Sequence, residues 1–175
     1  MAFSSLAEID GYMKENTCEF WEAVIREEAR DSQQPEMDIV NRMTQMYRAM
    51  KEADETYDDT LTSHSGLSGK NGKRMADYAA THKCMCGEFG GAVMARAIKM
   101  AESNACMKRI VAAPTAGSCG VVPAILITYE RMTNTSENDM VKALFVAAGI
   151  GDVIARRASI SGARGGCQAE IGASS

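Results

Sequence analysis

The chain has 175 residues, of which 46% are hydrophobic and 24% charged, and its formal net charge at pH 7 is −4. This balance is typical of a globular chain with a hydrophobic core and excludes disordered, collagen-like and disulfide-scaffold chains. The negative charge and the 6% share of aromatic residues argue against a nucleic-acid-binding protein, which needs a basic surface and stacking side chains. We therefore expect one domain over residues 1–175.

The first sixty residues have the hydrophobic spacing of helices. Ser5 and Glu8 have the spacing of a capping box. A break is expected at residues 31–35, because Pro35 suits the start of a following helix. The apolar stripe of that helix, which we interpret as core or subunit contact rather than a cofactor site, consists of Ile39, Met43, Met46 and Met50.

The N-terminus and the uncharged stretch 112–129 indicate whether the protein is exported or inserted into a membrane. Residues 1–10 lack the basic and apolar regions of a signal peptide. In the uncharged stretch, Pro114, Gly117 and Pro123 favour a buried loop and a buried helix over a membrane span. We expect a cytoplasmic protein that does not enter the membrane, with reduced thiols at its six cysteines. Their spacing and the two histidines do not predict a complete zinc site.

The helical pattern stops over residues 60–73, a run rich in Ser and Gly with one His and two Lys. Such a run predicts a loop. It is either a plain connection or a loop whose hydroxyls, amides and cations hold a carboxylate. The residues of this second interpretation are Ser63, His64, Ser65 and Lys70, and His64 is the preferred histidine for acid–base chemistry.

Helix is expected to resume near Met75, with glycines that allow close packing. A Gly/Ser-rich turn then leads into an apolar helix from about Pro123, within the motif A-P-T-A-G-S-C-G-V-V-P-A (Ala113–Ala124). Backbone N–H groups at a helix start form an anion site, although the ending of a P-loop is missing. Ser136 and Asp139 predict the start of a further helix. Since no convincing strand pattern occurs, we predict an all-α domain with Gly/Ser-rich active-site loops.

A second Gly-rich motif, S-I-S-G-A-R-G-G-C-Q-A-E-I-G, spans Ser159–Gly172 and contains Cys167. Together with the Ala113–Ala124 motif and the segment S-H-S-G-L-S-G (Ser63–Gly69), it resembles the catalytic α domain of the iron–sulfur-dependent L-serine dehydratases. The resemblance runs along the whole chain. It is strongest to the α chain of the two-subunit form.

This resemblance implies a mainly helical domain that carries a [4Fe–4S] cluster and converts L-serine to pyruvate and ammonia without pyridoxal phosphate. It also implies a β chain as partner and a homo-oligomer. Cys167 is the expected cluster ligand, because it matches the cysteine of the family's G-C-Q-A-E-I-G motif. The other family ligands lie in a motif expected beyond Ser175. The chain is therefore expected to be the N-terminal part of an α chain, without a bound cluster and inactive alone.

The same resemblance implies that the loop before the apolar helix binds the substrate carboxylate through amides and hydroxyls. Its residues are Thr115, Ala116, Gly117, Ser118, Cys119 and Gly120. For Cys119 we favour lining of the substrate pocket over cluster ligation or core packing. The proton-abstracting base is not identifiable from the sequence.

Two alternatives stay open. The first is a related L-cysteine desulfidase, in which the same kind of cluster would assist the loss of sulfide from L-cysteine instead of the loss of water from L-serine. A non-catalytic helical subunit could keep the motifs without the cluster. Nucleotide binding is disfavoured, because no G-x-G-x-x-G follows a predicted strand.

Overall fold

A computed structural model describes residues 3–175. Within that range the chain forms helices and no strand, so the all-α prediction is confirmed. The elements are α1 (Leu6–Asn16), α2 (Phe20–Ser32), α3 (Glu36–Glu55), α4 (Asn71–Ala79), α5 (Gly87–Ala105), the 3-10 turn η1 (Ala116–Ser118), α6 (Val121–Thr133), α7 (Glu137–Arg157), α8 (Gly162–Gly165) and α9 (Cys167–Ser174).

The predicted helix starts at Ser5, Pro35 and Ser136 agree with the structure, whereas the helix expected near Met75 begins earlier, at Asn71, and is followed by a separate helix from Gly87. The Ser5 hydroxyl accepts the backbone N–H of Glu8 at 3.2 Å, but the Glu8 carboxylate turns back to Ser4 instead of completing the capping box at Ser5. Pro35 is the residue that precedes α3. The Ser136 hydroxyl accepts the backbone N–H of Asp139 at 3.2 Å. Side-chain oxygens thus satisfy N–H groups that have no partner inside the helix.

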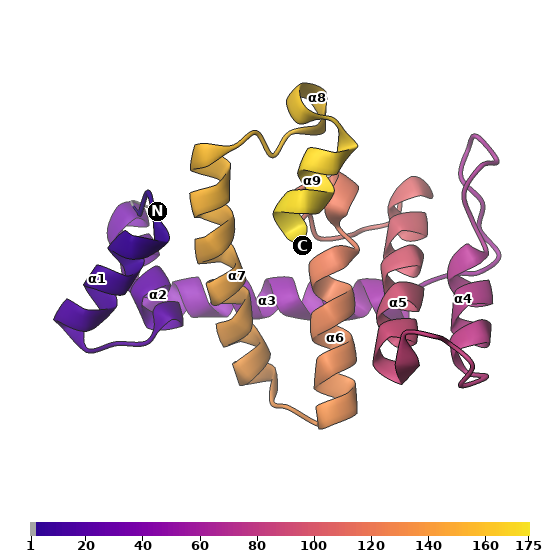
Figure 1. Ribbon diagram of the computed structural model, residues 1–175, viewed down its shortest axis with the longest axis horizontal. Coiled ribbons are helices and arrows are strands. Elements are labelled where there is room, and N and C mark those ends of the chain that lie inside the picture. The colour runs from indigo at the N-terminus through magenta and orange to yellow at the C-terminus, as the bar shows by residue number, and fades with distance from the viewer. Residues whose placement is uncertain (1–2) are drawn as a thin grey trace.

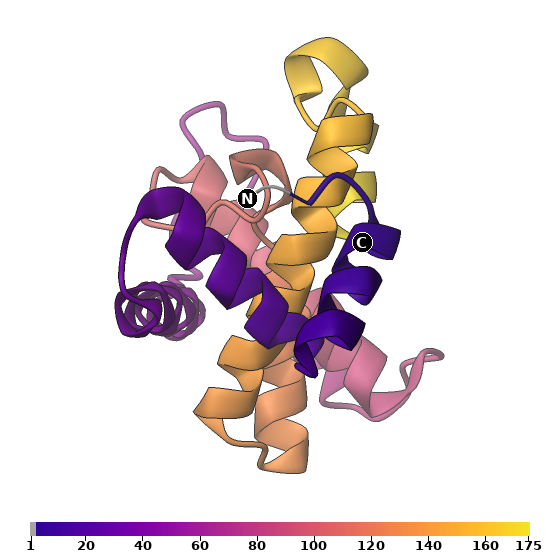
Figure 2. The same cartoon turned by 90° about the vertical axis from the view of Figure 1, so that its left-hand side faces the viewer.

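The helices are arranged around the long helix α3. Helices α4, α5, α6 and α7 stand side by side across it (Figure 1), and the view turned by 90° shows α3 end-on (Figure 2). Helices α1 and α2 lie at one end of this row, beside α7. The short helices α8 and α9 lie over the row between α7 and α6.

The main hydrophobic core lies where α2, α3, α6 and α7 meet. Tyr47 and Ile127 are fully buried in it. Of the predicted apolar stripe on α3, the first and last members are buried in this core, Met43 packs against it, and Met46 remains 45% exposed. The buried members are Val24, Ile25, Ile39, Tyr47, Met50, Ile127, Met140, Val141, Leu144 and Phe145.

Ion pairs link α3 to the end of α6 and the start of α7. The ammonium of Lys51 lies 2.9 Å from the Glu137 carboxylate and 3.2 Å from that of Glu130. Hydrogen bonds from Arg48 and Lys51 lower the pKa of Glu137. Because these pairs are partly exposed to solvent, each contributes little to the stability of the fold.

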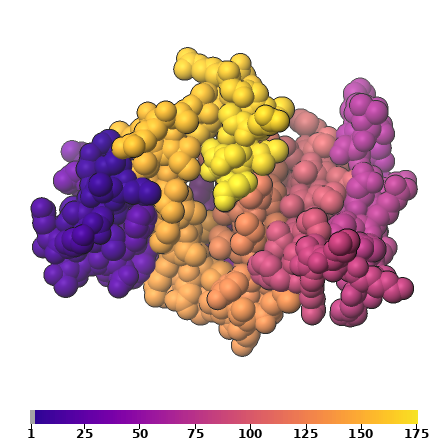
Figure 3. Space-filling view, viewed as in Figure 1, coloured from indigo at the N-terminus to yellow at the C-terminus, as the bar shows by residue number. Residues whose placement is uncertain are grey.

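A cavity of about 530 Å³ opens between α3 and the row in front of it. In the space-filling view α3 is visible through the hollow beside α9 (Figure 3). Its lining includes the apolar side chains of Met50, Val122 and Leu144, and one residue from each Gly-rich motif, Pro114 and Ile160. Within residues 3–175, no helix has the length and apolarity needed to cross a membrane.

Candidate active site

The loop of the Ala113–Ala124 motif is held by its own hydroxyl groups. Ser118 is only 2% exposed, and its Oγ lies 3.1 Å from Thr115 Oγ1 and 3.4 Å from the backbone nitrogen of Thr115. This reciprocal cap closes the 3-10 turn. The Ser118 hydroxyl therefore shapes the loop, while the partly exposed Thr115 and the exposed Ala116 and Gly117 form its open side.

The last two residues of the loop face α5. A Cβ at Gly120 would lie 2.6 Å from the carbonyl oxygen of Ala97, so only glycine lets the start of α6 approach α5 this closely. The Cys119 thiol is 1% exposed and lies 4.0 Å from the carbonyl oxygen of Met100. Burial raises its pKa. The structure therefore places this thiol in the core rather than on the open side of the loop.

Both Gly-rich motifs meet at the carboxylate of Glu170. A Cβ at Gly117 in η1 would collide with this carboxylate, and a Cβ at Gly162 in α8 would lie 3.0 Å from it. The two glycines thus create the space that the Glu170 side chain occupies. In residues 3–175 the carboxylate has no hydrogen bond or ion pair, although the residue is only partly exposed. A carboxylate in this state is free to receive a cationic or hydrogen-bonding ligand.

Cys167 is the first residue of α9, and its side chain is exposed. It precedes Glu170 by three residues, and residues with this spacing on a helix lie on neighbouring positions of one face. The sequence predicts only a Gly-rich turn here, but the segment folds into α8 and α9, with Gly166 between them at φ +77°. The described residues contain no group of three or more His, Cys, Asp or Glu side chains arranged to hold a metal.

The second predicted substrate loop forms a closed turn. The backbone N–H of Ser63 donates to the Ser68 carbonyl at 2.8 Å, and the Ser63 hydroxyl lies 3.1 Å from that of Ser65. His64 and Lys70 are exposed. In Figure 1 this loop lies on the far side of α5 from η1 and α9. The structure therefore does not bring Ser63, His64, Ser65 and Lys70 to the Ala113–Ala124 motif.

Glu102 of α5 anchors the end of that second loop. Its carboxylate accepts the hydroxyl of Tyr57 at 2.7 Å and the backbone N–H groups of Asn71 at 2.8 Å and Gly72 at 3.0 Å. Burial opposes ionisation of Glu102, but these hydrogen bonds outweigh it and keep its pKa below the ordinary value. Burial and this carboxylate together raise the pKa of Tyr57 to about 12.

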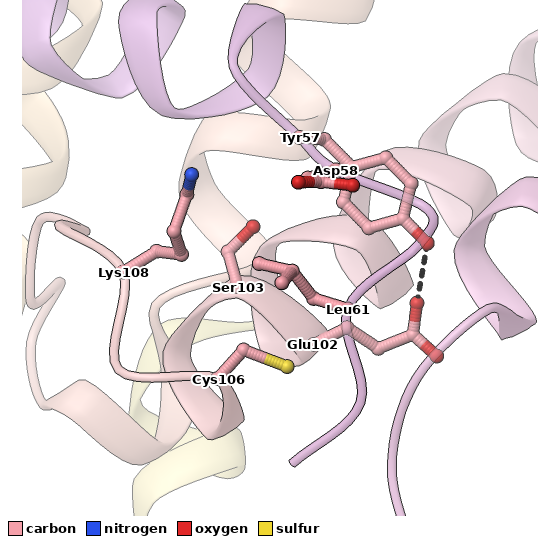
Figure 4. A pocket seen from close by; sticks show the side chains of 7 residues that line it. All are labelled: Tyr57, Asp58, Leu61, Glu102, Ser103, Cys106 and Lys108. Atoms are coloured by element: carbon pink, nitrogen blue, oxygen red, sulfur yellow. Dashed lines mark hydrogen bonds between the residues drawn. The ribbon is translucent and has the colours of Figure 1, made fainter.

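The space beside Glu102 is too small for a substrate. The cavity there has a volume of about 10 Å³. Figure 4 shows Tyr57, Leu61, Ser103 and Cys106 among the side chains that line it, together with the Tyr57–Glu102 hydrogen bond. Such a volume holds about one water molecule. Two residues along α5, the Asn104 amide donates to the Ala116 carbonyl at 2.9 Å. The end of α5 thus holds one loop on each side, and the side with η1 has the open carboxylate.

Sequence reasoning missed both glutamates. Glu170 could have been found from its spacing, because it follows Cys167 by three residues inside the Ser159–Gly172 motif. Glu102 has no such signal, because its partners lie 30 to 45 residues away in the sequence.

Comparison with known proteins bears on both motifs. Residues 15–175 match the family described as serine dehydratase alpha chain. The chain is 34% identical over 173 residues to the probable L-serine dehydratase alpha chain of Bacillus subtilis, covering 99% of this chain and 58% of that protein. It is 34% identical over 171 residues to the L-serine dehydratase alpha chain of Peptoniphilus asaccharolyticus, covering 96% of this chain and 58% of that protein.

A third relative matches a shorter region. L-serine dehydratase 1 of Escherichia coli is 46% identical over 77 residues, which is 43% of this chain and 17% of that protein. No solved structure matches the chain significantly. The chain spans somewhat more than half the length of the two alpha chains. With the family match covering nearly the whole sequence, this chain belongs to the serine dehydratase alpha chain family.

Proposed function

We propose that this chain is part of a cytoplasmic L-serine dehydratase, which converts L-serine to pyruvate and ammonia. The observation that carries the proposal is the meeting of the two Gly-rich motifs at the Glu170 carboxylate. The relatives named above supply the reaction, since each is named an L-serine dehydratase or its alpha chain. A β chain and further copies of this chain are the proposed partners.

The proposed cofactor is a [4Fe–4S] cluster with Cys167 as one ligand. An exposed thiol at the start of a helix is accessible to iron, and thiolates are the usual cluster ligands. Since the described residues hold no group of three metal-binding side chains, they do not complete a cluster site. When bound, such a cluster would supply a Lewis acid for the departing hydroxyl of serine.

The residues of this chain are proposed to bind and orient the substrate. L-serine carries an ammonium and a carboxylate group. Glu170 has the charge and the free acceptor oxygens for the ammonium group. The open side of the loop, at Thr115, Ala116 and Gly117, is proposed to receive the substrate carboxylate. Ser118 and Gly120 act indirectly, because one shapes the loop and the other seats it on α5.

The test uses the native complex that contains this chain, purified without oxygen and reconstituted with iron and sulfide. Pyruvate formation from L-serine is followed for the wild type, Cys167→Ala and Cys106→Ala. Cys106 is the matched control, because it is a partly buried cysteine at the end of α5, outside the two motifs. We expect pyruvate from the wild type and the control, and none from Cys167→Ala.

Each other outcome changes the assignment. Activity in Cys167→Ala would remove this cysteine as an essential ligand. Sulfide from L-cysteine, with no pyruvate from L-serine, would identify a desulfidase. A complex that binds no cluster and acts on neither amino acid would indicate a non-catalytic helical subunit.

A further inference from the structure

Two cysteines outside the candidate active site lie in contact. Cys84 and Cys86 are in the connection between α4 and α5, and their Sγ atoms are 3.1 Å apart. Cys86 is exposed and Cys84 is partly exposed. Met85 between them is fully exposed, so its side chain does not obstruct the pair.

Glycines and one local hydrogen bond position the two thiols. The backbone N–H of Gly87, at φ +75°, donates to the Cys84 carbonyl at 3.0 Å. A Cβ at Gly90 would lie 3.0 Å from the Cys86 sulfur, and a Cβ at Gly91 would lie 3.4 Å from the Cys84 sulfur. Gly90 and Gly91 therefore leave room for the two sulfur atoms.

The geometry suits a disulfide better than a metal. Tetrahedral zinc with Zn–S bonds of about 2.3 Å would require the sulfurs to move apart to about 3.8 Å and would need further ligands. The described residues provide no third His, Cys, Asp or Glu for such a group. A disulfide bond of about 2.05 Å requires the two sulfur atoms to approach by only about 1 Å and needs no further ligand.

We propose that Cys84 and Cys86 form a reversible oxidation site for low-molecular-weight disulfides. The hydrogen bond with Cys84 raises the pKa of Cys86, but Cys86 is the more exposed of the two thiols, and once deprotonated it attacks one sulfur of the small disulfide, which releases one small thiolate and leaves a mixed disulfide on Cys86. The Cys84 thiolate then attacks the Cys86 sulfur and releases the second small thiolate. Two protein thiols are oxidised to one disulfide, and one small disulfide is reduced to two thiols.

This site is separate from the candidate active site. The pair lies at the start of α5, whereas Glu102 and Asn104 hold the two loops at its end. A helix of 19 residues places these ends about 27 Å apart. In Figure 1 the α4–α5 connection lies at the bottom of the row of helices, beside the start of α5, whereas α9 lies at the top, between α7 and α6. Oxidation of the pair therefore does not depend on the proposed function.

The experiment uses this chain, fully reduced and then incubated with glutathione disulfide. Remaining thiols are alkylated, and the tryptic peptide 84–96, which contains both cysteines, is weighed. We expect a peptide without alkyl groups that is lighter by the mass of two hydrogen atoms, and its recovery as a dithiol after dithiothreitol. A peptide that carries two alkyl groups or two glutathione adducts, while Cys167 has reacted, would overturn the proposal.

Single variants test the order of the steps. In Cys84→Ser we expect a stable glutathione adduct on Cys86, because the resolving thiol is absent. In Cys86→Ser we expect the adduct on Cys84 to form several-fold more slowly. Cys106→Ser is the control and should leave oxidation of the pair unchanged. Equal adduct rates in the two pair variants would contradict Cys86 as the attacking thiol.

Oxidation of the chain unfolded in urea tests whether the fold, and not only the short spacing of the two cysteines in the sequence, favours the disulfide. If the fold holds the two sulfurs together, the ratio of disulfide to dithiol at a fixed glutathione ratio should be at least about tenfold higher in the folded chain. An equal or lower ratio in the folded chain would overturn the structural basis of the proposal.

Discussion

The carboxylates on the two sides of the α5 C-terminus differ in their hydrogen bonding. On one side, Glu102 is 4% exposed and accepts three hydrogen bonds that tie the start of α4 and Tyr57 to α5. On the other side, Glu170 lies against Gly117 and Gly162 and has no partner in residues 3–175. A fully satisfied carboxylate stabilises structure, whereas an unsatisfied one is available to a ligand.

The largest change in stability is expected when the Glu102 carboxylate is removed. Glu102→Ala would leave the Tyr57 hydroxyl and two backbone N–H groups without their buried acceptor. We expect the free energy of unfolding to fall by about 3 kcal/mol, measured by urea denaturation. The control is Glu88→Ala, an exposed glutamate in the first turn of the same helix. Equal losses in the two variants would show that Glu102 is not an anchor.

The next effect concerns the seating of the Ala113–Ala124 motif on α5. Gly120→Ala would place a methyl group against the backbone carbonyl of Ala97, which cannot move aside. We expect a loss of about 2 kcal/mol in the free energy of unfolding. Gly117→Ala should cost less than about 1 kcal/mol, because the group it meets is the end of the Glu170 side chain. A larger loss for Gly117→Ala than for Gly120→Ala would mean that the contact with Glu170 is more rigid than the contact with α5.

A smaller effect is the dependence of stability on pH through Glu102. Because the folded state lowers the pKa of this group, its contribution is complete above the ordinary value of 4.5 and is lost as the pH falls through the folded pKa. Unfolding free energy measured from pH 6 to pH 3 should therefore fall less steeply in Glu102→Gln than in the wild type. Parallel curves for the two proteins would contradict this role.

The smallest effect on stability is expected at Glu170. Since its carboxylate has no partner in the described residues, Glu170→Gln should change the free energy of unfolding by less than about 0.5 kcal/mol. Urea denaturation beside Glu102→Gln tests this directly. A loss as large as that of Glu102→Gln would remove the distinction between the two carboxylates.

The sequence predicts much of the fold because its helix signals are local. Ser5, Pro35 and Ser136 mark helix starts, and the stripe from Ile39 to Met50 marks the buried face of α3. Gly149 of α7 allows α2 to pack closely against α7, since a Cβ at this position would collide with the side chains of Val24 and Phe20.

The site was less predictable because its contacts are not local. The meeting of η1 with α9 depends on Gly117 and Glu170, which are far apart in the sequence. The separation of Ser63–Gly69 from the Ala113–Ala124 motif depends on α5 passing between them. A hydroxyl also gives no sign of its direction, and Ser118 turns inward while Thr115 remains partly exposed.

The most direct measurement is the turnover of L-serine by the native complex that carries Glu170→Gln, compared with Glu88→Gln. We predict that kcat/KM for pyruvate formation falls about 10- to 100-fold in Glu170→Gln, which corresponds to one lost charge-assisted hydrogen bond. The free energy of unfolding should stay unchanged in both variants. Unchanged turnover in Glu170→Gln, or a loss that accompanies unfolding, would contradict the assignment of the active site to the junction of η1 and α9.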